Sequence, residues 1–327
     1  MARPVTIFTG QWADLPMEEM CKTAKEMGYE GLEIASWGQI DVEKAAKDDN
    51  YVKEIKAMLE KYDLGCWAIG MHLPGQRVGD AEQWAYDPRL DNFAPSALAG
   101  KPDEIRAWGI QQMEYAAQAA KNMGVKTVTF FMGSPIWKMW YSFPQTSEEQ
   151  IEAGYQRIKE LWSPIMDVYD ACGVKLALEV HPTEIAYDYW STKRLLETFD
   201  YRPTLGINFD PSHLFWQGMD PVRAIRELKG AIYHFHAKDT KIDPYNTAVN
   251  GVLDTGSYGD LSKRSWVFRT VGYGHGEDVW KNILSELRTS GYDGAISIEH
   301  EDSYMSTREG LEKAITFLKD IIIKEQP

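Results

Sequence analysis

The chain has 327 residues, of which 44% are apolar and 26% are charged, and it carries a net charge of −14. This composition indicates a folded protein, and the acidic balance argues against a nucleic-acid binder. Three widely separated cysteines exclude a disulfide framework or a cysteine-based zinc site, and no segment approaches the roughly 18 apolar residues of a membrane span. The first residues lack the apolar core of a signal peptide, so we expect a soluble, cytoplasmic protein.

A helical stretch that ends in glycine and leads directly into an apolar run recurs four times along the chain. The glycines lie where the end of a helix favours a residue that tolerates positive φ, and they are Gly28, Gly124, Gly173 and Gly291. Each run that follows is short and rich in β-branched or aliphatic residues, which is typical of a buried strand. Helix followed by strand, repeated in this way, predicts an α/β protein with a parallel sheet.

The same patterns predict eight strands and eight helices along the whole chain. We expect strands near residues 5–8, 31–35, 64–70, 126–131, 174–180, 204–209, 231–237 and 295–299. We expect helices near residues 16–27, 50–61, 103–122, 148–171, 191–199, 220–229, 277–289 and 306–324. Two helices have predicted starts at an aspartate closely followed by proline, at Asp14 with Pro16 and at Asp220 with Pro221.

Eight strand–helix pairs are the number found in a (β/α)₈ barrel, or TIM barrel. We therefore predict the α/β class and a single TIM-barrel domain over residues 1–327. The alternative is a doubly wound sheet, which has no fixed count of eight and usually carries a glycine-rich phosphate loop after the first strand. Here the first strand leads into TGQWADLP, which is not a GxGxxG motif, so the barrel is favoured.

Three long connections follow strands, near residues 71–102, 132–147 and 238–276. In a barrel such connections lie on the C-terminal face, where active sites are built. They are rich in tryptophan and tyrosine, which serve either as lids packed on their own aromatic side chains or as a surface that stacks on a sugar or binds a partner. The aromatic residues are Trp84, Trp137, Trp140, Tyr141, Tyr245, Tyr258, Trp266 and Tyr273, of which Trp137 is a candidate for substrate binding.

In the last four strands, alternate residues form one apolar face and one face that becomes polar toward the end of the strand. Side chains of a strand alternate between two sides, and the apolar side of a barrel strand packs against helices, so the polar side points inward. Three carboxylates that face one another are unfavourable without a cation, and an oxygen-rich set with one imidazole suits Mn²⁺, Mg²⁺ or Co²⁺ better than a structural zinc. The residues predicted to converge at the top of the barrel as metal ligands are Glu179, Asp210, His236 and Glu299.

Further polar residues closely follow these positions in the sequence. They either hold substrate hydroxyls and orient a ligand, or form loop salt bridges and caps, and they are His181, His213, Lys238 and Asp239. His275 lies in a glycine-rich segment that either approaches a ligand or forms a tight turn, and we favour the turn. Glu33 points inward on the second strand and is a lesser candidate for the site.

The segments LALEVHPTE, NFDPSHL, YHFHAKD and SIEHED occur in this order along the chain. They resemble the xylose-isomerase-like TIM-barrel superfamily of sugar and sugar-phosphate isomerases and epimerases, which also includes the endonuclease IV-like barrels, and the resemblance covers essentially the whole chain. It implies that Glu179, Asp210, His236 and Glu299 are metal ligands and that the two glutamates act as acid and base across a sugar carbon. It does not imply one substrate, because the superfamily hosts many reactions.

Within this superfamily, the segments QWADLP, GYEGLEIASWG, GSPIW and HPTEIAYDYW look like the large subunits of bacterial C-glycoside deglycosidases. That branch implies Mn²⁺ or a related metal, a small β subunit as partner, and removal of the C2 proton of a 3-oxo-glycoside so that the C1 bond breaks by elimination. A histidine that often follows the tryptophan is the base in that branch, and here this position is Lys138. A lysine can be the base if its pKa is lowered, or it can be an ordinary surface residue.

We therefore predict a metal-dependent enzyme that removes a proton next to the carbonyl of a keto-sugar or 3-oxo-glycoside. Isomerisation or epimerisation is the expected outcome, and C-glycoside cleavage with a small β subunit is the alternative. The catalytic candidates are Glu179, Glu299, Lys138 and His181, and the candidates for substrate binding are His213, Lys238, Asp239 and Trp137. A nucleic-acid enzyme would need more than the seven histidines present and a basic groove. A third hypothesis is an interaction protein that acts as one subunit of a complex, and a homo-oligomer is also possible.

Overall fold

Eight parallel strands close into a barrel in the computed structural model, which describes residues 3–82, 85–139 and 142–325. The order around the barrel is β1-β10-β7-β6-β5-β4-β3-β2, so the chain is a TIM barrel and the doubly wound alternative is excluded. All eight predicted strands are present, and each end lies within one residue of its expected position. The strands are β1 (Val5–Phe8), β2 (Gly31–Ala35), β3 (Gly65–Met71), β4 (Thr127–Phe130), β5 (Lys175–Glu179), β6 (Leu205–Phe209), β7 (Ile232–Ala237) and β10 (Ile296–Ile298).

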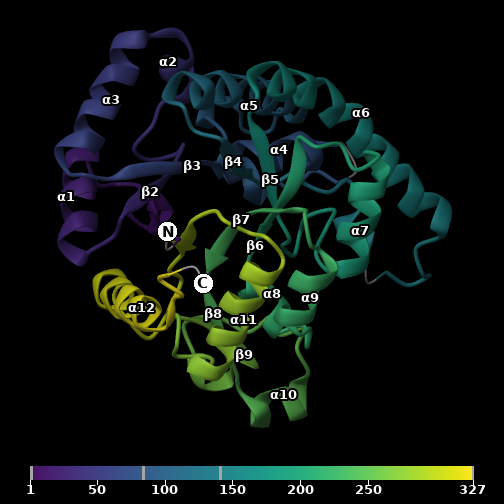
Figure 1. Cartoon of the computed structure of the whole chain (residues 1–327). Helices are drawn as coiled ribbons and strands as arrows, with labels where there is room; N and C mark the ends of the chain where they lie inside the picture. The colour runs from purple at the N-terminus through teal and green to yellow at the C-terminus, as the bar shows by residue number, and fades with distance from the viewer. Residues whose placement is uncertain (1–2, 83–84, 140–141, 326–327) are drawn as a thin grey trace.

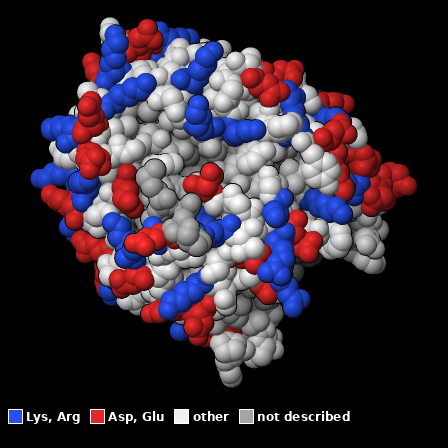
Figure 2. Space-filling view, in the orientation of Figure 1, with Lys and Arg blue, Asp and Glu red and all other residues white. Residues whose placement is uncertain are grey.

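Helices surround the barrel on its outer side (Figure 1). The eight long or strand-connecting helices that the sequence predicts are α1 (Met17–Met27), α3 (Asp49–Lys61), α5 (Pro102–Met123), α6 (Glu148–Cys172), α7 (Tyr189–Thr198), α9 (Pro221–Glu227), α11 (Glu277–Thr289) and α12 (Thr307–Ile321). Among the described residues, each helix is too short or too polar to cross a bilayer. Basic and acidic side chains are interspersed over the face shown in Figure 2 rather than forming one basic surface there.

The ends of the helices follow the local chemistry of the sequence. The four predicted glycines all have positive φ, between 68° and 91°, as the turn from a helix into a strand requires. Asp220 caps α9 by accepting from the backbone of Val222, as predicted. The prediction for Asp14 is wrong, because the residue before the first turn of α1 is Pro16, and no side chain caps that turn.

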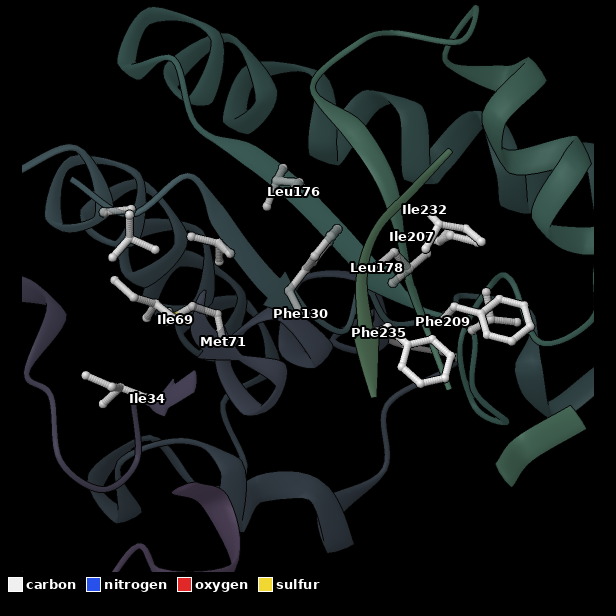
Figure 3. Close-up of a cluster of buried hydrophobic side chains, with 14 of the residues drawn as sticks. Ile34, Ile69, Met71, Phe130, Leu176, Leu178, Ile207, Phe209, Ile232 and Phe235 are labelled. Carbon is white, nitrogen blue, oxygen red and sulfur yellow. The ribbon is translucent and has the colours of Figure 1, made fainter. Parts of the chain in front are cut away.

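The apolar faces of the strands form the core between barrel and helices (Figure 3). Alternate residues of β5, β6 and β7 point outward, as their period of two predicts, and the rings of Phe209 and Phe235 stack with centroids 6.1 Å apart. The layer includes Ile34, Ile69, Met71, Phe130, Leu176, Leu178, Ile207, Phe209, Ile232 and Phe235, all of them buried. Burial of this layer on the outside leaves the inward face of the strands free for polar side chains.

The long connections contain short elements that the sequence did not predict. These are α2 (Val42–Lys47), α4 (His72–Asp80), α8 (Pro211–Phe215), α10 (Pro244–Asn250) and an antiparallel pair formed by β8 (Asp239–Ile242) and β9 (Trp266–Arg269). Helix α4 has the sequence HLPGQRVGD, and its proline and glycines are typical of a loop rather than of a helix. Tertiary contact overrides this local preference, because the small residues let α4 pack directly on the chain that follows β4.

We expect Gly75→Ala to destabilise the fold through this contact. A Cβ at Gly75 would lie 2.2 Å from the carbonyl oxygen of Phe131, and backbone cannot yield as a flexible side chain can. The free energy of unfolding in urea should fall by about 1–3 kcal/mol. Gly276→Ala is the matched control, since nothing lies within 4 Å of its Cβ position and its φ is −81°. Equal stability of the two variants would contradict the proposed packing role of α4.

Candidate metal centre

Four acidic and imidazole side chains from consecutive strands meet at the C-terminal end of the barrel. Each offers one ligand atom, and these atoms all lie within 4.8 Å of one another. Glu179 ends β5, His236 lies in β7, and Asp210 and Glu299 directly follow β6 and β10. Glu179, Asp210 and His236 are buried, and the side chain of Glu299 is 13% exposed. The structure therefore brings together the four residues that the sequence selected as metal ligands.

The His236 ring is oriented by a carboxylate on its far side. Its Nε2 lies 3.0 and 3.1 Å from the two carboxylate oxygens of Glu33, so Nε2 carries the proton. Its Nδ1 makes no hydrogen bond, although it lies 3.2 Å from Glu179 Oε2 and 3.0 Å from Glu299 Oε2. Burial would lower the pKa of His236, but Glu33, Glu179 and Glu299 hold it well above its usual value, so without a metal a proton lies on Nδ1 between the carboxylates, and a bound cation would take its place.

Glu33 is the hub of the barrel interior, although the sequence ranked it as a lesser candidate. It is fully buried and accepts hydrogen bonds from Thr129, His234 (2.7 Å), Ser297 (2.7 Å) and His236. Burial alone would raise the pKa of Glu33, but the imidazoles of His236 and His234 hold it well below its usual range. Glu33 is therefore an anion that positions His236.

Lys238 supplies the positive charge closest to the ligand carboxylates. Its Nζ lies 3.0 Å from Asp210, 2.9 Å from Glu299 and 3.1 Å from Glu301. Burial would lower the pKa of Lys238, but Asp210, Glu299 and Glu301 hold it well above its usual value. Burial also acts to raise the pKa of Glu299, while Lys238 and His236 bring it down to about 2.

Asp210 is the candidate ligand whose ionisation is made unfavourable by the neighbouring carboxylates. Its burial, with the charges of Glu179 and Glu299, raises its pKa to about 7 in spite of Lys238. One of its oxygens caps α8 by accepting from the backbone of Ser212 at 2.8 Å, and the other faces the cluster. A single ammonium therefore does not balance the acidic groups gathered here, and a divalent cation would lower the cost of keeping them ionised.

Two residues that contact Glu179 were missed by the sequence reasoning. His72, the first residue of α4, places its Nε2 3.1 Å from Glu179 Oε2, and Asn208 in β6 donates to the same oxygen at 3.2 Å. The ring of His72 packs against Phe8 and Phe131, with centroids 5.3 and 4.8 Å away. The sequence could have indicated these two residues only by where they lie, because both are polar residues at the C-terminal ends of barrel strands.

His181 and His213 lie together on the other side of Glu179. Their ring centroids are 4.0 Å apart, and His213 Nε2 lies 3.3 Å from Glu179 Oε1. Burial lowers the pKa of both imidazoles, that of His213 well below its usual value, so both rings are neutral near pH 7. The two histidines are thus placed at the centre, next to the ligand Glu179.

Asp239 anchors a loop in the structure rather than pointing into the ligand cluster. Its two oxygens accept from the backbone of Thr240, Gly272 and Gly274, from both the backbone and Nδ1 of His275, and from the indole of Trp280. Among the described residues, these contacts occupy the whole carboxylate. The glycine-rich segment around His275 therefore forms a tight turn on a buried anion.

Lys138 and Trp137 lie beside a separate cavity of about 600 Å³ on the same end of the barrel. Lys138 is exposed and donates to the backbone carbonyl of Tyr86 at 2.8 Å. The ring of Trp137 packs edge-on against Tyr187 at 5.5 Å. The cavity is lined by Asp80, Ala85, Asp87, Arg89, Leu90, Ser134, Trp137, Lys138 and Thr183. Within the described residues, no contact joins Lys138 to the four predicted ligands.

Among the other aromatic residues of the long connections, some are packed against other rings and some are exposed. Trp266 stacks on Trp216, with centroids 4.8 Å apart, and so covers the β8–β9 pair. The exposed rings are those of Tyr245 (78% exposed), Tyr258 (43%) and Tyr273 (42%). Three of the predicted residues, Trp84, Trp140 and Tyr141, lie outside the described residues.

The donor set at the centre fits a divalent cation. Three carboxylates and one imidazole face a common point, and Glu33 directs Nδ1 of His236 there. Hard oxygen donors with one imidazole are the ligands that Mn²⁺, Mg²⁺ or Co²⁺ accept, and an oriented histidine with a carboxylate behind it is common in metal sites. Glu179, Asp210, His236 and Glu299 are the residues that would hold the ion.

The chain matches a family profile described as xylose isomerase-like TIM barrel over residues 21–321. It is also similar to the uncharacterized protein YfiH of Bacillus subtilis (strain 168), with 29% identity over 97% of this chain and 99% of that protein. Two solved structures have the same fold across nearly the full length of both chains. The 3-keto-D-glucoside 4-epimerase YcjR of E. coli has a TM-score of 0.60 at 16% identity, covering 96% of this chain and 99% of that one. The IOLI protein with a bound zinc atom has a TM-score of 0.63 at 15% identity, covering 97% of each chain.

We expect Glu33→Gln to weaken metal binding without unfolding the barrel. The amide keeps the shape of the side chain but removes the anion that accepts from Nε2 of His236, so the ring is no longer held with Nδ1 available as the metal ligand. Loss of such a supporting carboxylate commonly reduces metal affinity about 10–100-fold. The Kd for Mn²⁺ can be measured by competition with a chelating dye.

Ser297→Ala is the matched control for this variant, because it removes another hydrogen bond to Glu33 and leaves the carboxylate in place. Its Kd should stay within a few-fold of that of the unmodified chain. An unchanged Kd in Glu33→Gln would contradict the positioning role.

Proposed function

This chain belongs to the xylose isomerase-like TIM barrel family, and from that premise we propose that it is a divalent-metal-dependent enzyme acting on sugars. The proposed reaction begins with removal of a proton from the carbon next to the carbonyl of a keto-sugar or 3-oxo-glycoside. Return of a proton then gives an isomer or epimer.

One observation carries the proposal, and it is the convergence of three carboxylates and Nδ1 of His236 on a common point. When bound there, a divalent cation such as Mn²⁺ would polarise the carbonyl and hydroxyl oxygens of the substrate. Glu299 is the most accessible of the four ligands, since its side chain retains 13% exposure while Glu179 is almost fully buried. A substrate that enters from the C-terminal face therefore reaches Glu299 directly.

Glu299 and Glu179 are the proposed acid–base pair. Lys238 and His236 hold the pKa of Glu299 at about 2 against the effect of burial, so at neutral pH this side chain is an ionised carboxylate that carries no proton of its own. Abstraction breaks a C–H bond and leaves its electron pair on the substrate as an enediolate. Glu299 then holds the proton and can return it to the same carbon or to the neighbouring one, and inversion would require that Glu179 has first taken up a proton from solvent, which it would deliver from the other side of the carbon.

The named neighbours are consistent with this chemistry. One solved structure with the same fold is a 3-keto-D-glucoside 4-epimerase, and another carries a zinc atom. These likenesses support the family fold, and the donor set of this chain supports the metal. The donor set favours Mn²⁺, Mg²⁺ or Co²⁺ because three of its four ligands are carboxylates.

The experiment is proton NMR in D₂O on the Mn²⁺-loaded chain, with a 3-oxo-glucoside and a free ketohexose in separate samples. We expect loss of the proton signal next to the carbonyl of at least one substrate. Glu299→Gln should slow this exchange by about 10²–10⁴-fold, because an amide cannot accept the proton.

Glu312→Gln on α12 is the matched control, because its carboxylate pairs with Arg308 and belongs to none of the candidate metal-binding groups. It should exchange at the full rate. Full exchange by Glu299→Gln with metal supplied would exclude the proposed role of this residue.

A second candidate function is C-glycoside cleavage, in which loss of the proton is followed by expulsion of the C1 substituent. The separate cavity of about 600 Å³ favours a substrate with a second part, since it offers the Trp137 ring and the cations Arg89 and Lys138. Thr183, two residues after His181 in the sequence, also lines this cavity. We propose a small β subunit or a second copy of the chain as the partner of this activity.

We expect Trp137→Ala to discriminate between substrates if this second candidate is correct. The KM for an aryl 3-oxo-glucoside should rise about 10-fold, because loss of an aromatic contact removes about 0.5–1.5 kcal/mol beyond the buried area. The KM for the methyl 3-oxo-glucoside should not change, since a methyl group does not reach the ring. Equal effects on both substrates would argue against a subsite at Trp137.

A further inference from the structure

A cavity of about 520 Å³ lies at the N-terminal mouth of the barrel, at the end opposite to the candidate metal centre. Its walls are formed by residues at the start of β3, β4, β5 and β7 and by the segment 291–295 that leads into β10. Ligand cavities in proteins commonly measure roughly 300–1,000 Å³, so this one is large enough for a small molecule. The reaction proposed for the metal centre does not use it.

Two aromatic residues line this cavity from opposite sides of the barrel. In the closed order of strands, β3 and β7 are separated by three strands in either direction. Each has a register shift with one neighbour, and the residues left without a pairing partner there are Trp67 in β3 and Tyr233 in β7. Both residues line the cavity. Such irregularities commonly redirect a side chain toward a functional site.

Both rings are held in place by glycines of the adjacent strands. A Cβ at Gly31 would lie 2.7 Å from Cδ1 of Trp67, and a Cβ at Gly206 would lie 2.2 Å from Cδ2 of Tyr233. The hydroxyl of Tyr233 also donates to the carbonyl oxygen of Pro203 at 2.9 Å. Trp67 is nevertheless 41% exposed. An ordered ring with an accessible surface is suited to packing on a planar ligand.

Two lysines supply positive charge on the wall between these rings. Lys126 directly precedes β4 and Lys175 is the first residue of β5, and both strands lie between β3 and β7. Lys175 donates to the carbonyl oxygen of Pro203, and its Nζ lies 5.2 Å from the centroid of the Tyr233 ring. Among the described residues, neither lysine pairs with a carboxylate, and Asp293 lines the cavity across the barrel from β4. In a chain with a net charge of −14, two such cations on one wall favour an anionic ligand.

His234 lines the inner end of the cavity. It is 2% exposed, and its Nε2 lies 2.7 Å from Oε2 of Glu33. Glu33 is an anion that only accepts, so Nε2 carries the proton and Nδ1 of the neutral ring keeps its lone pair. In the part of the chain that the structure describes, no hydrogen bond reaches this Nδ1. A buried acceptor without a partner is unfavourable, so a ligand hydroxyl that donates to Nδ1 would complete the site.

We propose that this cavity binds a hydroxylated aromatic carboxylate, with its ring between Trp67 and Tyr233, its carboxylate at Lys126 and Lys175, and its hydroxyl donating to Nδ1 of His234. Each part of the ligand matches one feature of the walls, namely the two rings, the two ammonium groups and the buried acceptor. The cavity shares none of the four candidate metal ligands. The inference therefore does not depend on the proposed reaction.

The test is isothermal titration calorimetry of the full chain with 6-hydroxy-2-naphthoate, in the presence of a chelator so that the carboxylate cannot bind an ion at the metal centre. We expect one molecule bound per chain. 2-Naphthoate, which lacks the hydroxyl, should bind about 10-fold more weakly, because Nδ1 of His234 then stays without a partner. 6-Hydroxy-2-naphthamide should also bind about 10-fold more weakly, because it lacks the charge that the lysines attract.

Trp67→Leu should raise the Kd for 6-hydroxy-2-naphthoate about 10-fold, since an aromatic contact is lost. The double variant Lys126→Gln/Lys175→Gln should raise it by a similar factor, and it replaces two side chains that are not buried, so it tests the site even if Trp67→Leu does not fold. Trp190→Leu is the matched control, because Trp190 is 70% exposed on α7 and does not line the cavity. Its Kd should equal that of the unmodified chain.

Absence of binding, or an unchanged Kd in both the Trp67 and the lysine variants, would overturn the proposed site. A Kd raised by Trp137→Ala and not by Trp67→Leu would place the probe in the cavity of about 600 Å³ at the other end of the barrel, and would overturn it as well. Weaker binding by the Trp67 and lysine variants, with Trp190→Leu and Trp137→Ala unchanged, supports the site.

Discussion

The buried carboxylate of Glu33 is the constraint on which the candidate centre depends. It lies inside a closed barrel, where an unpaired charge would be prohibitive, and it is stabilised by side chains from β4, β7 and β10. These bonds join strands that are distant in sequence and determine which nitrogen of His236 carries the proton. The orientation of Nδ1 of His236 toward the other candidate ligands is thus a consequence of how the carboxylate of Glu33 is hydrogen-bonded.

A barrel can hold a buried carboxylate because the outward face of its strands is apolar and the inward face is polar. Leu176, Ile207 and Phe235 point outward and bury apolar surface against the helices. The inward positions of the same strands are then available for polar side chains that could not be tolerated in an ordinary core. Parallel strands place their C-terminal ends at one rim, so Glu179 and His236 meet although 57 residues separate them.

Excess negative charge is the electrostatic property of that rim. The pKa of Asp210 is raised to about 7 even though Lys238 lies 3.0 Å away, which shows that one ammonium does not balance the carboxylates around it. The two histidines beside Glu179 are neutral and add donors without adding charge. Both properties favour cations, and they make the rim distinct from the separate cavity where Lys138 lies.

The sequence by itself determined the barrel fold and which residues of the last four barrel strands point inward. Helix–glycine–strand repeats and a period of two are local properties, so eight strands and the inward position of Glu179, Asp210, His236 and Glu299 could be read without contacts. Only the tertiary structure decided the rest. Helix α4 contradicts its own propensities because it packs on the chain after β4. The hub role of Glu33 and the anchoring role of Asp239 depend on partners up to 264 and 41 residues away, and no local pattern encodes such pairings.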